Sequence, residues 1–198
     1  MVGEIGEWVL RAACQQIREW QKMGLSPRIA VNVSARQFQQ YDVSQLVSTA
    51  ISEARISPES LELELTESAV MHDAEASIVT VEKLKQLGVG IAIDDFGTGY
   101  SSLSYLKRLP VESLKIDQSF VRDISNDTND AAIVRAIITL ARSLEMKVTG
   151  EGVETEAQME FLKAYGCQFA QGYLFGKPMT AAEFTGRMRT REISAAVG

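Results

Sequence analysis

The chain has 198 residues, of which 45% are apolar, enough to build the core of one large domain or two small ones. Its formal net charge of −6 argues against general binding to nucleic acids or membrane surfaces, although bound cations could reverse the charge locally for an anionic substrate. The two cysteines, Cys14 and Cys167, stand apart from any CxxC or Cys/His cluster, which favours a reduced, cytoplasmic protein.

The first predicted element is an amphipathic helix over residues 5–20, because apolar side chains recur there at helical spacing. Gly24 and Pro27 end this helix, and we expect its two tryptophans to lie in the core. The opening residues lack the basic-then-apolar order of a secretory signal. No apolar run reaches the ~18 residues of a membrane span, so we expect no membrane segment in this chain.

Beyond residue 27, short β-rich segments alternate with longer helical patterns, which indicates βα units and a parallel sheet. The predicted strands are residues 28–34, 61–66, 90–96, 113–118, 147–152 and 169–174. The predicted helices between them are residues 43–55, 75–87, 101–108, 129–144 and 155–164. No linker or change of composition divides the chain, so we expect a single domain over residues 1–186 and a flexible tail over residues 187–198.

The two faces of each predicted strand differ in polarity when residues are assigned by the period of two. The polar face carries Asn32, Glu62, Glu64, Asp94, Lys115, Asp117, Glu151 and Gln171. Helices cover both faces of an open doubly wound sheet, so a polar face is out of place there, whereas in a barrel it points inward. A (β/α)8 barrel needs eight strands and about 250 residues. The pattern therefore predicts an α/β barrel of the TIM type that lacks its first two strands.

An all-oxygen set of side chains belongs to this predicted inner layer. Its members are Asn32, Glu64, Asp94, Asp95 and Glu151. Hard divalent cations prefer oxygen ligands, and a carboxylate shared between two such ions is the arrangement of two-metal phosphodiester hydrolysis. Lys115 on the next strand would add positive charge for the developing phosphorane or the leaving group. The sequence thus predicts a metal centre that cleaves a phosphodiester.

Simpler interpretations compete with this one. Two adjacent aspartates alone would more often be a helix cap or a turn, but five other strands that end in polar residues favour a site. Residues 95–97 match the DFG motif of protein kinases, yet the glycine-rich ATP loop, the HRD motif and the lysine that kinases carry on their third strand do not accompany them. Glu62 could be a structural partner of Lys115 or of Lys147.

Six motifs, taken in order, resemble those of the EAL family of cyclic di-GMP phosphodiesterases. They are VNVSARQF, ELTES, DDFGTGYSSLSYLKRLP, LKID, EGVE and QGYLF. The likeness covers nearly the whole chain, and the combination is far more specific than any one motif. It implies a modified TIM barrel that hydrolyses cyclic di-GMP to linear pGpG with Mg²⁺ or Mn²⁺, while Ca²⁺ binds without supporting turnover.

The resemblance implies roles for the matched oxygen ligands. Asn32, Glu64 and Asp94 match the ligands of the first metal, and Asp94 with Asp95 matches the pair that bridges the two metals. Glu151 matches the residue assigned as general base or as a contact of the second metal.

Further site residues follow from the same resemblance. Lys115 matches the lysine near the attacking water, and Glu67 matches the glutamate that holds the loop after the aspartate pair. Glu154 and Gln171 match further site residues, and Asp117 is grouped with them as a residue that binds substrate or completes the site.

The chain departs from the family at one point, because it has no Glu-Ala-Leu segment. In the family, that segment carries a metal-binding glutamate, and a nearby arginine contacts a substrate phosphate; this chain lacks both. We therefore expect weak or no turnover, whether the chain is a fragment of an active enzyme or a naturally shortened homologue. The alternatives are a module that binds cyclic di-GMP without turnover and a dimerisation module of a larger sensor.

The expected partners are cyclic di-GMP and a second copy, not DNA or RNA, with the homodimer formed through open edge strands or the loop 96–104. A GGDEF or sensor domain is expected in a longer parent protein.

Overall fold

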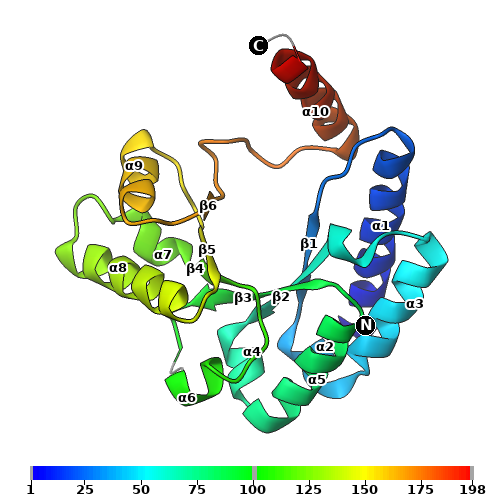
Figure 1. Cartoon of the computed structure of the whole chain (residues 1–198), viewed down its shortest axis with the longest axis horizontal. Helices are drawn as coiled ribbons and strands as arrows, with labels where there is room; N and C mark the ends of the chain where they lie inside the picture. Colours follow the sequence, from blue (N-terminus) through cyan, green and yellow to red (C-terminus); the bar gives the residue numbers. More distant parts are fainter. Residues whose placement is uncertain (1, 100–101, 197–198) are drawn as a thin grey trace.

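The computed structural model describes residues 2–99 and 102–196, with side chains for 3–99 and 102–189. Within these residues, six parallel strands form one sheet in chain order. The strands are β1 (Ile29–Val33), β2 (Leu61–Thr66), β3 (Gly90–Phe96), β4 (Ser113–Ile116), β5 (Lys147–Gly150) and β6 (Phe169–Ala170). The sheet curls with its helices on the outside and stays open between β1 and β6 (Figure 1). The predicted TIM-type barrel without its first two strands is confirmed.

Eleven helical segments cover the described part of the chain. They are α1 (Val2–Lys22), α2 (Ala35–Gln40), α3 (Val43–Ala54), η1 (Pro58–Ser60), α4 (Glu67–Met71), α5 (Ala74–Gln86), α6 (Leu103–Leu106), α7 (Gln118–Arg122), α8 (Thr128–Ser143), α9 (Glu156–Ala164) and α10 (Ala181–Ala196). The predicted helix 101–108 corresponds to α6, and its first residue lies outside the described part. The predicted boundary at residue 186 falls within α10, and the flexibility of the tail stays a prediction. No described helix combines the length and the apolar character that a membrane span requires.

The helices α2, α4 and α7 were not expected from the sequence pattern. Each begins directly after a strand, where Ser34, Thr66 or Asp117 accepts a hydrogen bond from a backbone N–H of the first turn. These caps turn the chain away from the barrel immediately, so the inward side chains at the strand ends stay next to one another.

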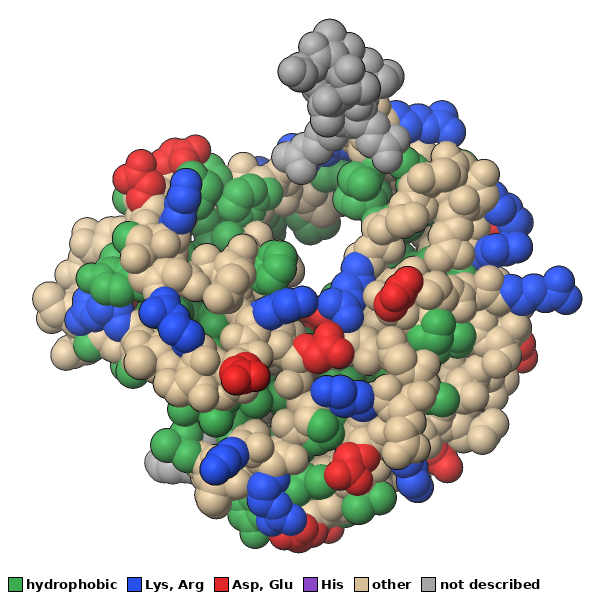
Figure 2. Space-filling view, viewed as in Figure 1, with side chains coloured by type: hydrophobic (Ala, Val, Ile, Leu, Met, Phe, Trp, Pro, Cys, Tyr) green, Lys and Arg blue, Asp and Glu red, His purple; other side chains and the backbone are tan. Residues whose placement is uncertain are grey.

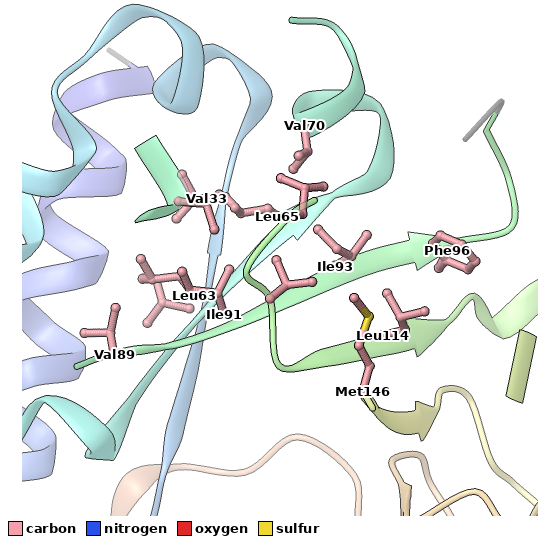
Figure 3. Close-up of a cluster of buried hydrophobic side chains, with 14 of the residues drawn as sticks. Val33, Leu63, Leu65, Val70, Val89, Ile91, Ile93, Phe96, Leu114 and Met146 are labelled. Carbon is pink, nitrogen blue, oxygen red and sulfur yellow. The ribbon is translucent and has the colours of Figure 1, made fainter. Parts of the chain in front are cut away.

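The hydrophobic core lies between the outward face of the sheet and the helices (Figure 3). Leu63, Leu65, Ile91, Ile93 and Leu114 are all fully buried there. Burial of each such side chain stabilises the fold by about 1.5–3 kcal/mol, so the apolar face fixes the direction in which each strand presents its other face. The polar face is therefore left to line the inside of the barrel, as predicted.

The open side of the barrel forms a groove of about 950 Å³ between β1 and β6, which is visible as a hollow in Figure 2. The helix α10 borders it and packs against the end of α1: the rings of Trp20 and Phe184 lie 5.1 Å apart, and Trp20 Nε1 donates to Thr185 Oγ1 at 2.7 Å. Trp20 is thus buried as expected, but the expectation for Trp8 is wrong, because 69% of that residue is exposed.

Candidate active site

One lysine on β4 lies among three carboxylates, two on the neighbouring strands β2 and β3 and one directly after β5. Lys115 Nζ is 2.6 Å from Glu64 Oε1, 2.6 Å from Glu151 Oε1 and 3.2 Å from Asp94 Oδ1. The exposed fraction of the lysine side chain is 5%, and the carboxylate side chains are between 6% and 16% exposed. We call these four residues the Lys115 cluster. The structure therefore brings together four of the residues that the sequence singled out.

Strand register explains why these side chains meet. In the sheet Glu64 pairs with Ala92, and Lys115 pairs with Thr149, so the residues at these positions share the inner face. Leucine, isoleucine and valine occupy the intervening positions and are buried under the helices. A slip of one residue would reverse both faces, so the apolar core also fixes the position of the polar cluster.

The adjacent aspartates reach the same site through an irregularity in β3. Neighbouring residues of a regular strand point to opposite faces, but the β3–β4 register shifts between Ile93 and Phe96. Asp95 has a φ of 53°, in the left-handed region that aspartate tolerates better than most side chains. As a result, one carboxylate oxygen each from Asp94, Asp95 and Glu151 lie within 4.8 Å of one another. This spacing suits carboxylates that share a metal ion.

The electrostatics of the cluster are those of a partly neutralised acidic site. Burial raises the pKa of Glu64 and of Glu151, and the hydrogen bonds from Lys115 oppose this rise. Burial would lower the pKa of Lys115, but its hydrogen bonds to Glu151 and Glu64 raise it overall, so the ammonium stays charged. The pKa of Asp95 is raised by burial, by the charge of Asp94 and by a hydrogen bond with Asp117.

One oxygen of this site lacks a hydrogen bond. Asp94 Oδ1 is buried and accepts none from the residues that the structure describes, since its contact with Lys115 is an ion pair without hydrogen-bond alignment. Buried carboxylate oxygens are normally satisfied by a donor, water or a metal ion. An orphaned oxygen within an all-oxygen donor set fits a divalent cation such as Mg²⁺ or Mn²⁺.

The buried carboxylate of Glu67 contacts the loop that follows the aspartate pair. Its Oε2 accepts a hydrogen bond from the N–H of Gly97 at 2.9 Å. Gly97 has a φ of 104°, and a Cβ on Gly99 would lie 2.8 Å from Glu67 Oε1. Sequence analysis missed these glycines, although the G-T-G spacing after two aspartates signals a loop that must approach another group closely.

The remaining predicted site residues lie around the Lys115 cluster rather than in it. Asp117 caps α7, and its proximity to Asp95 helps to raise the pKa of that carboxyl. Asn32 lies on the edge strand β1, and Gln171 follows β6 and lines the groove. Glu154 is exposed in the loop before α9. Asn32 and Gln171 therefore lie on or directly after the strands that border the open side.

A second cation meets carboxylates nearer the amino ends of the strands. Arg28 lies 3.1 Å from Glu62 Oε2 and 3.5 Å from Glu112 Oε2, and we call these three residues the Arg28 cluster. The expected pairing of Glu62 with Lys115 or Lys147 is wrong. The predicted strand 28–34 begins at Arg28, but the sequence pattern gave this side chain no partner. In the structure Arg28 precedes β1 and reaches Glu62 on β2 and Glu112 before β4.

Comparison with known proteins places the chain in a family. The model of the EAL domain matches residues 1–178. The chain belongs to the EAL domain family. Among curated proteins it is similar to MucR of Pseudomonas aeruginosa, described as a bifunctional diguanylate cyclase/cyclic di-GMP phosphodiesterase, with 52% identity over 184 residues. That match covers 92% of this chain and 27% of MucR, and the chain spans about a quarter of the length of the curated relatives it matches.

Solved EAL structures share the fold. MucR phosphodiesterase in complex with c-di-GMP superimposes with a TM-score of 0.89 at 52% identity, covering 91% of this chain and 74% of that one. The EAL domain of Mycobacterium smegmatis DcpA gives a TM-score of 0.89 at 41% identity, covering 96% and 86%. Klebsiella pneumoniae BlrP1, solved with manganese and c-di-GMP, gives 0.81 at 27% identity, covering 90% and 45%. The resemblance read from the motifs is confirmed.

Proposed function

We propose that this EAL domain is a metal-dependent phosphodiesterase that hydrolyses cyclic di-GMP to pGpG, with weak or no turnover in this 198-residue chain. The observation that carries the proposal is the convergence of Glu64 on β2, Asp94 and Asp95 on β3, and Glu151 directly after β5. The name of MucR and its structure with c-di-GMP support the choice of substrate.

Five residues supply the proposed metal ligands: Asn32, Glu64, Asp94, Asp95 and Glu151. Their oxygens suit Mg²⁺ or Mn²⁺, and Ca²⁺ should bind without supporting turnover. Bound divalent ions would supply an activated water and positive charge on the phosphate oxygens. The barrel contributes the rigid spacing of these ligands, since each lies on or directly after a strand.

The other proposed roles concern charge and proton movement. Glu151 accepts the proton of the attacking water as general base, and Lys115 stabilises negative charge on the phosphorane or leaving group. Glu67 anchors the loop after the aspartate pair through Gly97. Three further residues bind the substrate or complete the site: Asp117, Glu154 and Gln171.

A second function, binding of cyclic di-GMP without turnover, is favoured by the open groove beside the site. The edge strand that carries Asn32 has no neighbour on its other side among the described residues. The Glu-Ala-Leu segment, with the metal-binding glutamate and phosphate-contacting arginine expected there, is absent from this sequence. Loss of one electrostatic contact to a transition state can cost about 10²–10³ in rate.

The test separates these two functions. Formation of pGpG from cyclic di-GMP is followed by chromatography with Mg²⁺, Mn²⁺ or Ca²⁺, and nucleotide binding is followed by calorimetry. We compare the unchanged chain with Glu151→Gln and with Glu160→Gln, a matched change on the exposed side of α9. Slow hydrolysis with Mg²⁺ or Mn²⁺ that only Glu151→Gln removes supports the enzyme. Binding without hydrolysis supports the second function, and the absence of both contradicts the proposal.

An added segment tests the reason for weak turnover. A fusion that supplies roughly 60 preceding residues with a Glu-Ala-Leu motif, the size of two βα units, should raise the hydrolysis rate by about 10²–10³. Equal rates with and without the segment would contradict the role given to it.

The proposed setting is a cytoplasmic homodimer within a longer protein that carries a GGDEF or sensor domain. The edge strands β1 and β6 offer unpaired backbone groups to a second copy. The loop 96–104 is the alternative contact, and residues 100–101 within it lie outside the described part. Light scattering at micromolar concentration should give the mass of a dimer, and a well-folded monomer would contradict this assembly.

A further inference from the structure

Lys115 is enclosed to the same degree as residues of the apolar core, with 4% of the residue exposed. A buried ammonium destabilises a fold unless its donors are matched by acceptors. Two of the three donors have short partners in Glu64 and Glu151, both at 2.6 Å. Among the described residues, the third faces Asp94 Oδ1 at 3.2 Å, an oxygen that accepts no hydrogen bond. The ammonium is therefore held by charge on all sides, but incompletely hydrogen-bonded.

The oxygens that hold Lys115 overlap with those suited to a metal ion. Asp94 and Glu151 belong both to the Lys115 cluster and to the group of three carboxylates whose oxygens lie within 4.8 Å of one another. An ammonium and a divalent ion that share a carboxylate lie close together and repel each other, and burial weakens the screening of that repulsion. The two cations therefore bind at each other's expense.

In the metal-free domain the charge of Lys115 balances only part of the charge of the carboxylates. Glu64, Asp94, Asp95 and Glu151 present four carboxylates, whereas Lys115 contributes one positive charge. Asp94 Oδ1 lies 3.2 Å from the ammonium but accepts no hydrogen bond from the described residues, so it can still accept a further cation. We propose that Lys115 is an internal cation that holds these carboxylates together in the metal-free domain and competes with the divalent ion for them. This inference rests on the proposed metal-dependent function.

Two consequences follow from competition. Removal of the ammonium should tighten metal binding, because the shared oxygens become free and a repelling charge is lost. Removal should also destabilise the metal-free fold, because carboxylates then face one another without a cation. A metal ion bound only by the folded state restores stability, so its effect on the thermal midpoint should be larger in the variant than in the unchanged chain.

The experiment uses Mn²⁺ alone on chain freed of metal by a chelator. Calorimetry gives the affinity, and thermal unfolding with and without Mn²⁺ gives the stabilisation. The variants are Lys115→Met and Lys115→Gln, and the latter keeps amide donors in case the former does not fold. Arg28→Met is the matched control, because it removes a cation from the second ion-pair cluster in the same barrel.

Competition predicts at least tenfold tighter Mn²⁺ binding in both Lys115 variants, a larger rise of their thermal midpoint with Mn²⁺, and no change in Arg28→Met. Equal or weaker binding in the Lys115 variants would overturn the inference and leave the metal-dependent function standing. An absence of Mn²⁺ binding in every form of the chain would overturn the metal site itself and, with it, the proposed function.

Discussion

The Lys115 cluster and the Arg28 cluster contain the same chemistry, a cation among carboxylates on the inner side of one barrel. Glu64 and Glu62 are only two residues apart on β2 and share a face. Their surroundings differ, because the Lys115 side chain is 5% exposed and the Arg28 side chain is 39% exposed. A shift of two residues along a strand thus separates a screened ion pair from an enclosed one.

The comparison shows that the burial of the charged groups, rather than their number, decides whether the carboxylates depend on a bound cation. Water can replace Arg28 as a partner of Glu62, so that pair contributes little to folding. The carboxylates around Lys115 lack that substitute and depend on a bound cation, whether an ammonium or a metal ion. Substitutions that remove one member of each cluster are the direct way to test this contrast.

The largest effect is expected from Lys115→Met in the absence of metal. Breaking a buried ion pair on one side leaves uncompensated charge, which typically costs about 3–5 kcal/mol of unfolding free energy. Urea unfolding with a chelator present measures the loss. A loss below about 1 kcal/mol would show that the Lys115 cluster behaves like the exposed one and would remove the contrast.

An intermediate loss of stability is expected from Glu67→Ala. This variant extends the comparison to a carboxylate that accepts a hydrogen bond from a backbone N–H. The N–H of Gly97 would lose its acceptor, at a cost of about 1–3 kcal/mol. Hydrogen exchange at Gly97 should accelerate. The control is Glu75→Ala, which removes the exposed partner of Arg108 and should leave Gly97 unchanged. Equal exchange at Gly97 in both variants would argue against the anchoring of this loop.

The smallest effect is expected from Arg28→Met. The ion pairs with Glu62 and Glu112 are partly exposed, so their removal should change the unfolding free energy by no more than about 1 kcal/mol. The difference should shrink in 1 M salt, where charges are screened within about 3 Å. A loss as large as that of Lys115→Met would show that exposure does not separate the two clusters.

The alternation of polar and apolar residues was sufficient to predict the barrel, because each strand has one face that only helices can bury. It also placed Glu64, Asp94 and Lys115 on a common face before any contact was known. It did not reveal why Asp95 joins them, since a register shift against β4 depends on a strand remote in sequence. The partner of Glu62 was also missed. Arg28 is the first residue of the predicted strand 28–34, but its side chain was given no partner, and its contact with Glu62 on β2 is a tertiary property.

The short helices after the strands show a second limit of the sequence pattern. They are too short to show a helical period of apolar residues, so only their capping residues indicate them. The sequence pattern placed Lys115 on the face of the carboxylates, but it was interpreted through the substrate, the attacking water and a pair with Glu62. Its pairing with three carboxylates is a property of the metal-free fold that no motif records.

Titration of the metal-free chain with Mn²⁺ in a calorimeter, beside Asp94→Asn, tests the central claim most directly. Asp94 joins both the Lys115 cluster and the group of three converging carboxylates, so its charge should be needed for any metal to bind. The account predicts weak but measurable binding to the unchanged chain and none to the variant. Equal binding by the two proteins would show that these carboxylates are not a metal site.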